Sequence, residues 1–429
     1  MVNEAQRGLK QMIDWKLIIC YLLLLVIGLA NIYASIHSAD PEPFLAWSTR
    51  SGKQVVWVLT SLLLASVILF AVNPKLWEVI SVPAYLGVLV LLVAVIFLGV
   101  EVKGSRSWFA FGPVRFQPAE ISKISTSLLL AAIMSRQGFK MSRARDFLIV
   151  AAVVLLPMLV IVAESETGSA LVYVGFMFVL YREGLSGWLL YVVAMAILLF
   201  ILTLTSPFWV PLAALAAGVL FYFYMNRHTL SRPARRIRTI RLSVAGLAVG
   251  LALIFSTQFV FNNILQDHQR KRIEVLLGMK EDPSGVGYNV TQSMIAIGSG
   301  GFTGKGFLNG TQTTYGFVPE QSTDFIFCTV GEEWGFVGCA VVILLYAFMI
   351  FRIIKDAEKS REAFTRIYGY CVASCIFMHL FINIGMTIGI MPVIGIPLPF
   401  LSYGGSSLWA FTIMLFIFLA LNKQENKYF

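Results

Sequence analysis

Long apolar stretches separated by polar linkers run through almost the whole chain. Twelve of them are near the length of a membrane-spanning helix, which needs about 20 predominantly apolar residues. They lie at residues 16–36, 53–72, 77–99, 119–135, 146–163, 167–181, 186–205, 209–226, 240–263, 324–351, 366–391 and 404–422. Although the stretch 119–135 begins with polar residues and 167–181 is short, the pattern predicts an all-α polytopic membrane protein with about 12 transmembrane helices.

The composition agrees with this fold class. Hydrophobic residues make up 58% of the chain and charged residues only 13%, which excludes an ordinary soluble domain. The first apolar stretch is long enough to stay in the membrane and is not predicted to be a cleavable signal peptide. The five cysteines lie in or beside apolar stretches without any CxxC pair, and the four histidines are scattered. The sequence therefore predicts neither disulfides nor a metal-binding cluster.

Basic residues predict the orientation of the chain, whose net charge is +10. They concentrate in the linkers 136–146, 227–241 and 352–366, which share one side if twelve spans are present. Short loops rich in Lys and Arg stay in the cytoplasm, so the tails 1–14 and 423–429 are expected there too. Binding of lipid headgroups or nucleic acid is the alternative, but the shortness of these loops favours the topological interpretation.

The opposite, extracytoplasmic side is predicted to carry the loops 101–118, 164–166 and 391–403 and one long loop, 266–323. The long loop contains a glycine-rich run, 295–310, that does not fit a nucleotide-binding P-loop. Ser299 stands where that motif needs glycine, and Gly306 where it needs Ser or Thr. Two interpretations remain open: backbone N–H groups and Lys305 facing a pyrophosphate, or glycines that permit tight packing.

Several outer residues are candidates for chemistry. Asp282 begins a sequence typical of a type I turn, so it either starts a turn or acts on a substrate. A short surface helix is expected at 288–297. Glu120 and Lys123 share a helix face at the start of a span, where they form a structural ion pair or a functional site.

The other outer loops are less specific. Arg106 and Trp108 suit the headgroup interface. Prolines and glycines between residues 391 and 407 break the last outer segment, which either lines a cavity or makes a simple re-entrant turn.

Four stretches together resemble the SEDS family (shape, elongation, division and sporulation), and specifically its RodA branch. They are "GSRSWFAFGPVRFQPAEISK", "DPSGVGYNVTQSMIAIGSGGFTGKGFLNGTQ", "FVPEQSTDFIF" and "MPVIGIPLPFLSYGGSS". The resemblance extends from "DWKL" at Asp14 to the last span.

The resemblance implies a peptidoglycan glycosyltransferase of the bacterial cytoplasmic membrane. Members polymerise lipid II, a disaccharide-pentapeptide on undecaprenyl pyrophosphate, for cell elongation and rod shape, and work with a class B penicillin-binding protein, a transpeptidase. The family's essential loop aspartate falls on Asp282. Its other motif positions fall on Arg106, Trp108, Glu120, Lys123, Lys305, Ser402 and Tyr403.

This chain departs from the family pattern in two places. The common Gln-Pro-Asp-x-Gly-Thr stretch is matched by residues 164–169, where Glu166 replaces the Asp. The family core has about ten spans, so residues 206–263 are expected to add a helix pair to the membrane domain, 15–422. An even-numbered insertion keeps Asp282 outside.

The implied reaction needs a base that activates a GlcNAc 4-hydroxyl, and our hypothesis gives that role to Asp282, with inversion at the anomeric carbon. Arg106, Lys123, Lys305, Arg270 and Arg272 are the candidates that neutralise the pyrophosphate. The alternative is a divalent cation, Mg²⁺ or Mn²⁺, held by Glu120 or Asp282.

Two other functions fit some of the same features. A lipid-precursor flippase or transporter would also have many spans, intramembrane charges and broken helices. It would further need an internal repeat and charges near the bilayer midplane, whereas this sequence has no visible repeat and its charges lie toward the outer edge. A scaffold that only recruits enzymes would have no need of so many polar groups in an outer loop.

Overall fold

The computed structural model describes residues 13–37, 43–102, 105–112, 114–229, 233–263, 265, 267–277, 279 and 286–426. Within these residues, nine helices are long and apolar enough to cross a membrane, and two shorter apolar helical segments accompany them. The all-α polytopic membrane fold is thereby confirmed. The chain divides into two compact units, residues 1–184 with 289–429 and residues 185–288.

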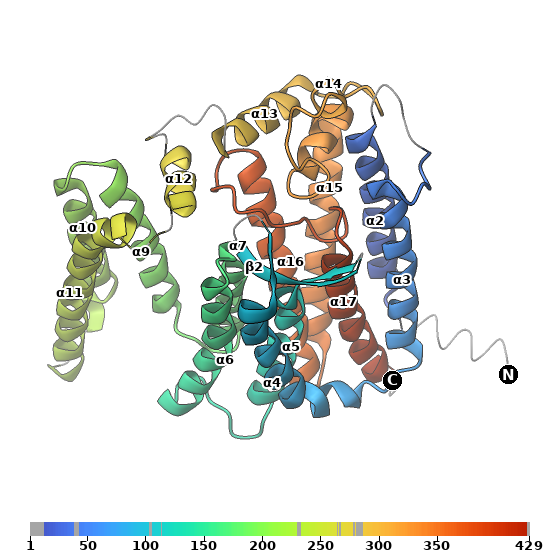
Figure 1. The fold of residues 1–429 in the computed structure, drawn as a ribbon. Helices are drawn as coiled ribbons and strands as arrows, with labels where there is room; N and C mark the ends of the chain where they lie inside the picture. Colours follow the sequence, from blue (N-terminus) through green and yellow to red (C-terminus); the bar gives the residue numbers. More distant parts are fainter. Residues whose placement is uncertain are drawn as a thin grey trace. The chain divides into compact units, whose positions relative to one another are not determined.

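The first unit is a bundle of long helices (Figure 1). Its N-terminal half contains α2 (Trp15–Ile36), α3 (Arg50–Phe70), α4 (Lys75–Leu98), α5 (Pro118–Met134), α6 (Ala144–Ala163), α7 (Thr167–Val172), the 3₁₀ turn η1 (Tyr173–Gly175) and α8 (Phe176–Arg182). Its C-terminal half contains most of α13 (Val286–Ser299), then α14 (Thr311–Thr314), α15 (Ile326–Lys359), α16 (Ala363–Thr387) and α17 (Gly405–Asn426).

Helices α5, α16 and α17 form the buried centre of this unit (Figure 1). Helix α5 begins with Pro118, whose fixed φ suits the first helical turn. Its polar residues are mostly small and buried, as in Ser122, whose hydroxyl lies 2.7 Å from the Tyr173 hydroxyl. Small polar residues let membrane helices approach closely and bond to one another, so the polar start of α5 does not prevent its burial.

The second unit contains α9 (Gly187–Thr205), α10 (Trp209–Met225), the 3₁₀ turn η2 (Arg227–Thr229), α11 (Pro233–Asn263) and α12 (Asp267–Leu276). Helices α9, α10 and α11 pack together around Leu199, Leu215 and Ile254. A Cβ at Gly250 would overlap the Leu215 side chain, so this glycine permits the close approach of α10 and α11. The expected extra pair, 206–263, lies within this unit and stays a prediction.

A small antiparallel sheet, which the sequence did not predict, occupies the loop 101–118, which is predicted to be the first outer loop. Its strands are β1 (Val100–Val102), β2 (Ser105–Phe111) and β3 (Val114–Phe116), in that order. The register places Trp108 opposite Val100 and Phe109 opposite Phe116. Backbone N–H and C=O groups need hydrogen-bond partners. The three strands supply these partners to one another within the loop.

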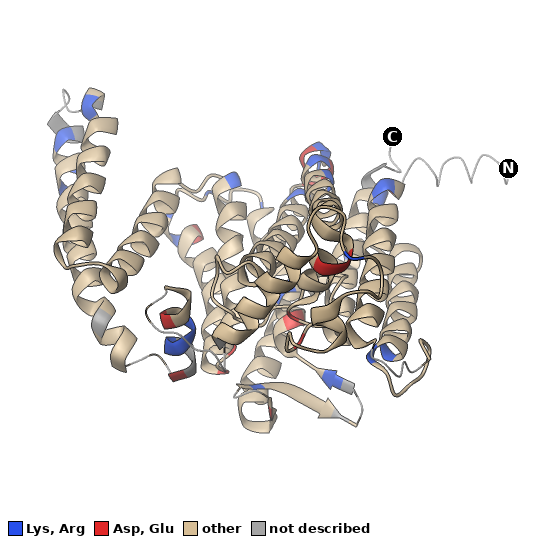
Figure 2. Ribbon diagram, turned by 90° about the horizontal axis from the view of Figure 1, so that it is seen from above, with Lys and Arg blue, Asp and Glu red and all other residues tan. Residues whose placement is uncertain are grey.

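The predicted break in the last outer segment is confirmed, since α16 ends at Thr387 and α17 begins at Gly405. The helix expected at 288–297 is also found, as α13. Charged residues are sparse along the ribbon in Figure 2, and most of the helical surface is neither acidic nor basic. Apolar side chains such as Leu344 and Phe351 are exposed on it, as expected for helices that face lipid.

Candidate active site

The broken segment 388–404 is joined to the "FVPEQST" segment, residues 317–323, by hydrogen bonds. The Ser402 hydroxyl donates to the Thr323 carbonyl at 2.6 Å and accepts from the Leu398 N–H at 2.8 Å. The Tyr403 N–H donates to the Ser322 carbonyl at 2.9 Å. Two motifs about 80 residues apart in sequence are therefore in direct contact. The Ser402 hydroxyl makes hydrogen bonds that hold this contact.

Arg50 and Gln54, at the start of α3, belong to the same cluster. The Arg50 guanidinium donates to the Ser322 hydroxyl at 2.5 Å and lies 5.9 Å from the centre of the Tyr403 ring. The Gln54 amide oxygen accepts from the Gly404 N–H at 3.3 Å. Arg50 is about half exposed and its guanidinium lies 4.0 Å from the partly exposed Glu320 carboxylate, so a positive charge with an exposed acidic neighbour stands beside Tyr403.

Glu120 and Lys123 form an ion pair in the buried centre of the bundle. The Lys123 ammonium lies 2.9 Å from both carboxylate oxygens of Glu120 and 2.9 Å from Nε2 of His379 on α16. Both members of the pair are almost completely buried. The ammonium also lies 5.0 Å from the centre of the Phe411 ring. A buried charge needs such partners, because isolation from water is costly.

Lys305 is engaged with a second buried acid, Glu332 on α15. Its ammonium lies 2.7 Å from Glu332 Oε1 and 2.7 Å from the Thr311 hydroxyl. The same carboxylate accepts from the N–H groups of Gln312 and Thr313, at 2.8 and 2.9 Å. Glu332 thus anchors the first turn of α14 and the end of the glycine-rich run to α15, while a role of Lys305 toward substrate stays a prediction.

The glycine-rich run packs directly against α15, at a kink where Gly335 has a positive φ. The N–H groups of Lys305 and Gly306 donate to the carbonyls of Glu332 and Glu333, at 3.0 and 2.9 Å. A Cβ at Gly304 would overlap the Glu333 carbonyl oxygen. These contacts favour the packing interpretation of the run, because six N–H groups between Gly300 and Asn309 are bonded within the protein.

The sheet carries Arg106 and Trp108 and is held by Glu166. The hydroxyls of Ser105 and Ser107, which are buried on β2, donate to Glu166 Oε1 at 2.7 and 2.6 Å. Alternation along the strand places Arg106 and Trp108 on the other face. Arg106 is exposed, with Nε 3.6 Å from Glu101 Oε2. The carboxylate that replaces the family's Asp therefore fixes the strand on which these two candidates lie.

Glu164, two residues earlier, is buried and neither of its carboxylate oxygens has a hydrogen-bond partner among the described residues. Burial raises the pKa of this carboxyl to about 8, and the nearby charge of Glu166 adds to the rise. A pKa of about 8 favours the protonated, uncharged form of this side chain at neutral pH. A protonated carboxyl is uncharged and similar in shape to the amide of glutamine.

Replacing Glu164 with Gln is expected to remove a pH dependence of stability. Between about pH 4.5 and 8 the unfolded carboxyl ionises while the folded one stays protonated, so wild-type stability falls as pH rises. The free energy of unfolding falls by at most about 1.4 kcal/mol for each pH unit in this range. Thermal unfolding measured from pH 5 to pH 8 should show the melting temperature of Glu164→Gln gaining steadily on wild type. Parallel curves would show that Glu164 is ionised in the folded protein.

Three further predicted site residues remain. Asp282 falls outside the described residues. Arg270, on α12, pairs with Asp267 at 3.3 Å and Glu274 at 3.7 Å. Arg272 of the same helix also interacts within the protein. Both arginines belong to the second unit, and their role toward a substrate stays a prediction.

The described residues do not fit a metal site. They contain no group of three or more His, Cys, Asp or Glu side chains that could hold an ion. Glu120, one of the two candidate ligands, has both oxygens bonded to Lys123, so a cation would have to displace the ammonium.

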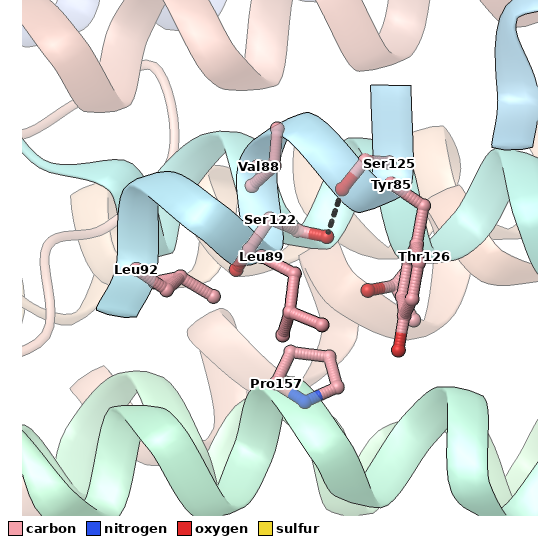
Figure 3. A pocket seen from close by; sticks show the side chains of 8 residues that line it. All are labelled: Tyr85, Val88, Leu89, Leu92, Ser122, Ser125, Thr126 and Pro157. Carbon is pink, nitrogen blue, oxygen red and sulfur yellow. Dashed lines mark hydrogen bonds between the residues drawn. The ribbon is translucent and has the colours of Figure 1, made fainter. Parts of the chain in front are cut away.

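A gap between α4, α5 and α6 is lined mainly by Tyr85, Leu89, Ser122 and Pro157 (Figure 3). Ser125 donates to the Ser122 carbonyl at 3.1 Å beside it. The gap has no room for a water molecule, so it is a packing irregularity and not a substrate site.

Sequence reasoning missed Arg50, Glu164, Glu332 and His379. Glu332 and His379 are ionisable residues inside apolar stretches. Burying such residues in a membrane costs free energy, so they are usually paired or functional, and their position in the sequence could have marked them as candidates. Arg50 lies at the edge of a span, where basic residues are common, and so gave no comparable signal.

The comparisons with known proteins agree with this geometry. The model of the cell cycle protein family that includes FtsW, RodA and SpoVE matches residues 14–222 and 237–427. Peptidoglycan glycosyltransferase MrdB of Escherichia coli K12 is 34% identical over 347 residues, covering 81% of this chain and 78% of the relative. Peptidoglycan glycosyltransferase RodA of Treponema pallidum (strain Nichols) is 30% identical, covering 96% and 98%.

A chain in a solved structure of a peptidoglycan synthase complex, described as coordinating polymerisation and crosslinking, has the same fold. It superimposes with a TM-score of 0.69 at 26% identity and covers 96% of this chain and 98% of its own. The family match extends over most of the sequence and includes all four quoted motifs. The chain is a multi-pass membrane protein of the FtsW/RodA/SpoVE cell cycle protein family.

Proposed function

We propose that the chain is a peptidoglycan glycosyltransferase that polymerises lipid II into glycan strands for cell elongation. The proposal is supported by its family and by relatives that bear this name, MrdB and RodA. The observation that carries it is the cluster at which residues 50–54, 317–323 and 402–404 meet. These three segments are far apart in sequence, and their contacts give the site a fixed framework.

The reaction joins two lipid-linked sugars. The 4-hydroxyl of a GlcNAc attacks the anomeric carbon of a MurNAc, the bond from that carbon to the pyrophosphate oxygen breaks, and the polyprenyl pyrophosphate leaves as an anion. A general base takes the hydroxyl proton, and we assign this role to Asp282. Attack opposite the leaving group inverts the configuration from α to β. One carboxylate suffices because the leaving group needs no proton, unlike that of a glycosidase.

Cationic side chains on the outer side stabilise the departing pyrophosphate. Arg106 is exposed on β2, and Arg50 is half exposed beside Tyr403, so both present charge that a substrate can reach. Lys123 and Lys305 are bonded to buried carboxylates. We therefore assign these lysines to holding the site, with Arg106 and Arg50 as the residues nearer to substrate.

The relevant partner is a class B penicillin-binding protein, whose transpeptidase would crosslink the strands. This assignment is supported by the likeness to a chain of a peptidoglycan synthase complex. The membrane is the bacterial cytoplasmic membrane, with both termini in the cytoplasm and residues 266–323 outside, as the basic linkers predict.

The deciding experiment incubates purified protein with lipid II and, in parallel, with liposomes that carry lipid II in one leaflet. A glycosyltransferase yields glycan polymer in the first assay. Translocation in the second without polymer in the first would instead identify a flippase, and neither product would identify a scaffold.

A further inference from the structure

A continuous hydrogen-bond chain leads from the buried ion pair to the broken segment 388–404. Glu120 binds Lys123, Lys123 binds Nε2 of His379, and Nδ1 of His379 lies 3.0 Å from the Pro397 carbonyl oxygen. His379 is 1% exposed and its ring meets that of Phe411 edge to face, with centroids 4.7 Å apart. Its orientation is therefore set on three sides.

The partners of His379 determine which ring nitrogen carries the hydrogen. The carbonyl oxygen of Pro397 can only accept, so Nδ1 must donate. The ammonium of Lys123, held by a carboxylate, can only donate, so Nε2 must accept. His379 is thus a neutral imidazole in the Nδ1–H form, and Lys123 is the group that selects this form.

The Pro397 carbonyl is one of several backbone carbonyls that accept hydrogen bonds from side chains of α15 and α16. Asn383, one helical turn after His379, donates to the carbonyls of Ile396 and Asp324 at 2.7 and 2.8 Å. The Tyr346 hydroxyl donates to the Pro399 carbonyl. Side chains on buried helices therefore replace the helical hydrogen bonds that prolines interrupt, and they set the path of the backbone toward Ser402 and Tyr403.

We propose that His379 is a positioning residue for the outer site. Its Nδ1–H bond to Pro397 fixes the backbone that presents Tyr403, and the Glu120–Lys123 pair acts on the site through this ring and has no direct contact with substrate. The expected effect on kcat/KM rests on the proposed function. The expected effect on the backbone of residues 397–404 does not.

Two substitutions separate the two bonds of the ring. In His379→Asn the amide nitrogen reaches about as far as Nδ1, so it keeps the donor to Pro397 and loses the acceptor for Lys123. In His379→Gln the amide oxygen reaches about as far as Nε2, so it keeps the acceptor for Lys123 and loses the donor to Pro397. His379→Phe loses both bonds and keeps the contact with Phe411.

We expect kcat/KM for lipid II to fall about tenfold or more in His379→Gln and His379→Phe, and by less than about threefold in His379→Asn, because small misplacements of a site are costly. The melting temperature should instead stay closest to wild type in His379→Gln, which keeps the acceptor for Lys123, and should fall furthest in His379→Phe, which loses both bonds. A purely structural role predicts equal activity per folded molecule in all three. Wild-type kcat/KM in His379→Gln, or equal losses in the Asn and Phe variants, would overturn the proposal.

Amide hydrogen exchange of residues 397–404 provides a readout that needs no activity. Exchange there should be faster in His379→Gln and His379→Phe than in wild type or His379→Asn. Unchanged exchange in His379→Gln would refute the positioning role. Altered exchange in a protein that makes no glycan would instead leave the positioning role standing and reject the proposed reaction.

Discussion

Polymerisation of lipid II by purified Asp282→Asn protein is expected to fall by about 10²–10⁴-fold, the usual contribution of a general base. An amide has nearly the same size as a carboxylate but cannot accept the proton of the attacking hydroxyl. Substrate binding should change much less than the rate. The measurement is glycan chain synthesis per folded molecule, with folding checked by the melting temperature.

Glu281→Gln is the matched control, because it removes the neighbouring carboxylate in the same segment. Its synthesis rate should stay close to that of wild type. Near-normal synthesis by Asp282→Asn, or a loss confined to Glu281→Gln, would reject Asp282 as the base. Labelling of a cysteine placed at 282 by a membrane-impermeant reagent in intact cells checks that the segment lies outside.

Lys123→Met should be the most destabilising single substitution in the buried centre. It leaves the Glu120 carboxylate, which is 3% exposed, without its cation and two of its hydrogen bonds. Removing one partner of a buried ion pair typically costs about 3–5 kcal/mol. We expect a markedly lower melting temperature in detergent and poor recovery of monodisperse protein.

The double substitution Glu120→Gln with Lys123→Met is the informative companion, because it leaves no buried charge. It should regain most of the lost stability. Arg182→Met, which breaks an exposed pair with Glu358 at 3.0 Å, should leave the melting temperature unchanged. Equal destabilisation by Lys123→Met and Arg182→Met would contradict the importance of the buried pair.

Hydrophobic patterning was sufficient for the class of fold and for the approximate ends of most helices. The spacing of Pro397, Pro399, Gly404 and Gly405 also predicted the interruption between α16 and α17. The sheet of the first outer loop escaped prediction because its strands are only three to seven residues long. Such short strands show little periodicity, and their pairing depends on contacts across the loop.

The candidate site was predictable only where partners are close in sequence. Glu120 and Lys123 are three residues apart on one helix, so their pairing could be expected. His379 is 256 residues from Lys123, and Glu332 is 27 residues from Lys305, distances at which a single sequence carries no pairing information. Lys305 was singled out as a cation near a glycine-rich turn, but its carboxylate partner could be found only in the structure.

The hydrogen bonds between the glycine-rich run and the kink of α15 limit insertions and deletions in this run. Four backbone bonds join the two: Lys305 to Glu332, Gly306 to Glu333, Phe336 to Gly301 and Val337 to Phe302. A residue inserted between Gly301 and Gly306 would shift this alignment and leave buried carbonyls of α15 without hydrogen bonds, at a cost of about 1–3 kcal/mol each. Length variation among homologues should therefore be rare in this run, although outer loops in general tolerate insertions readily.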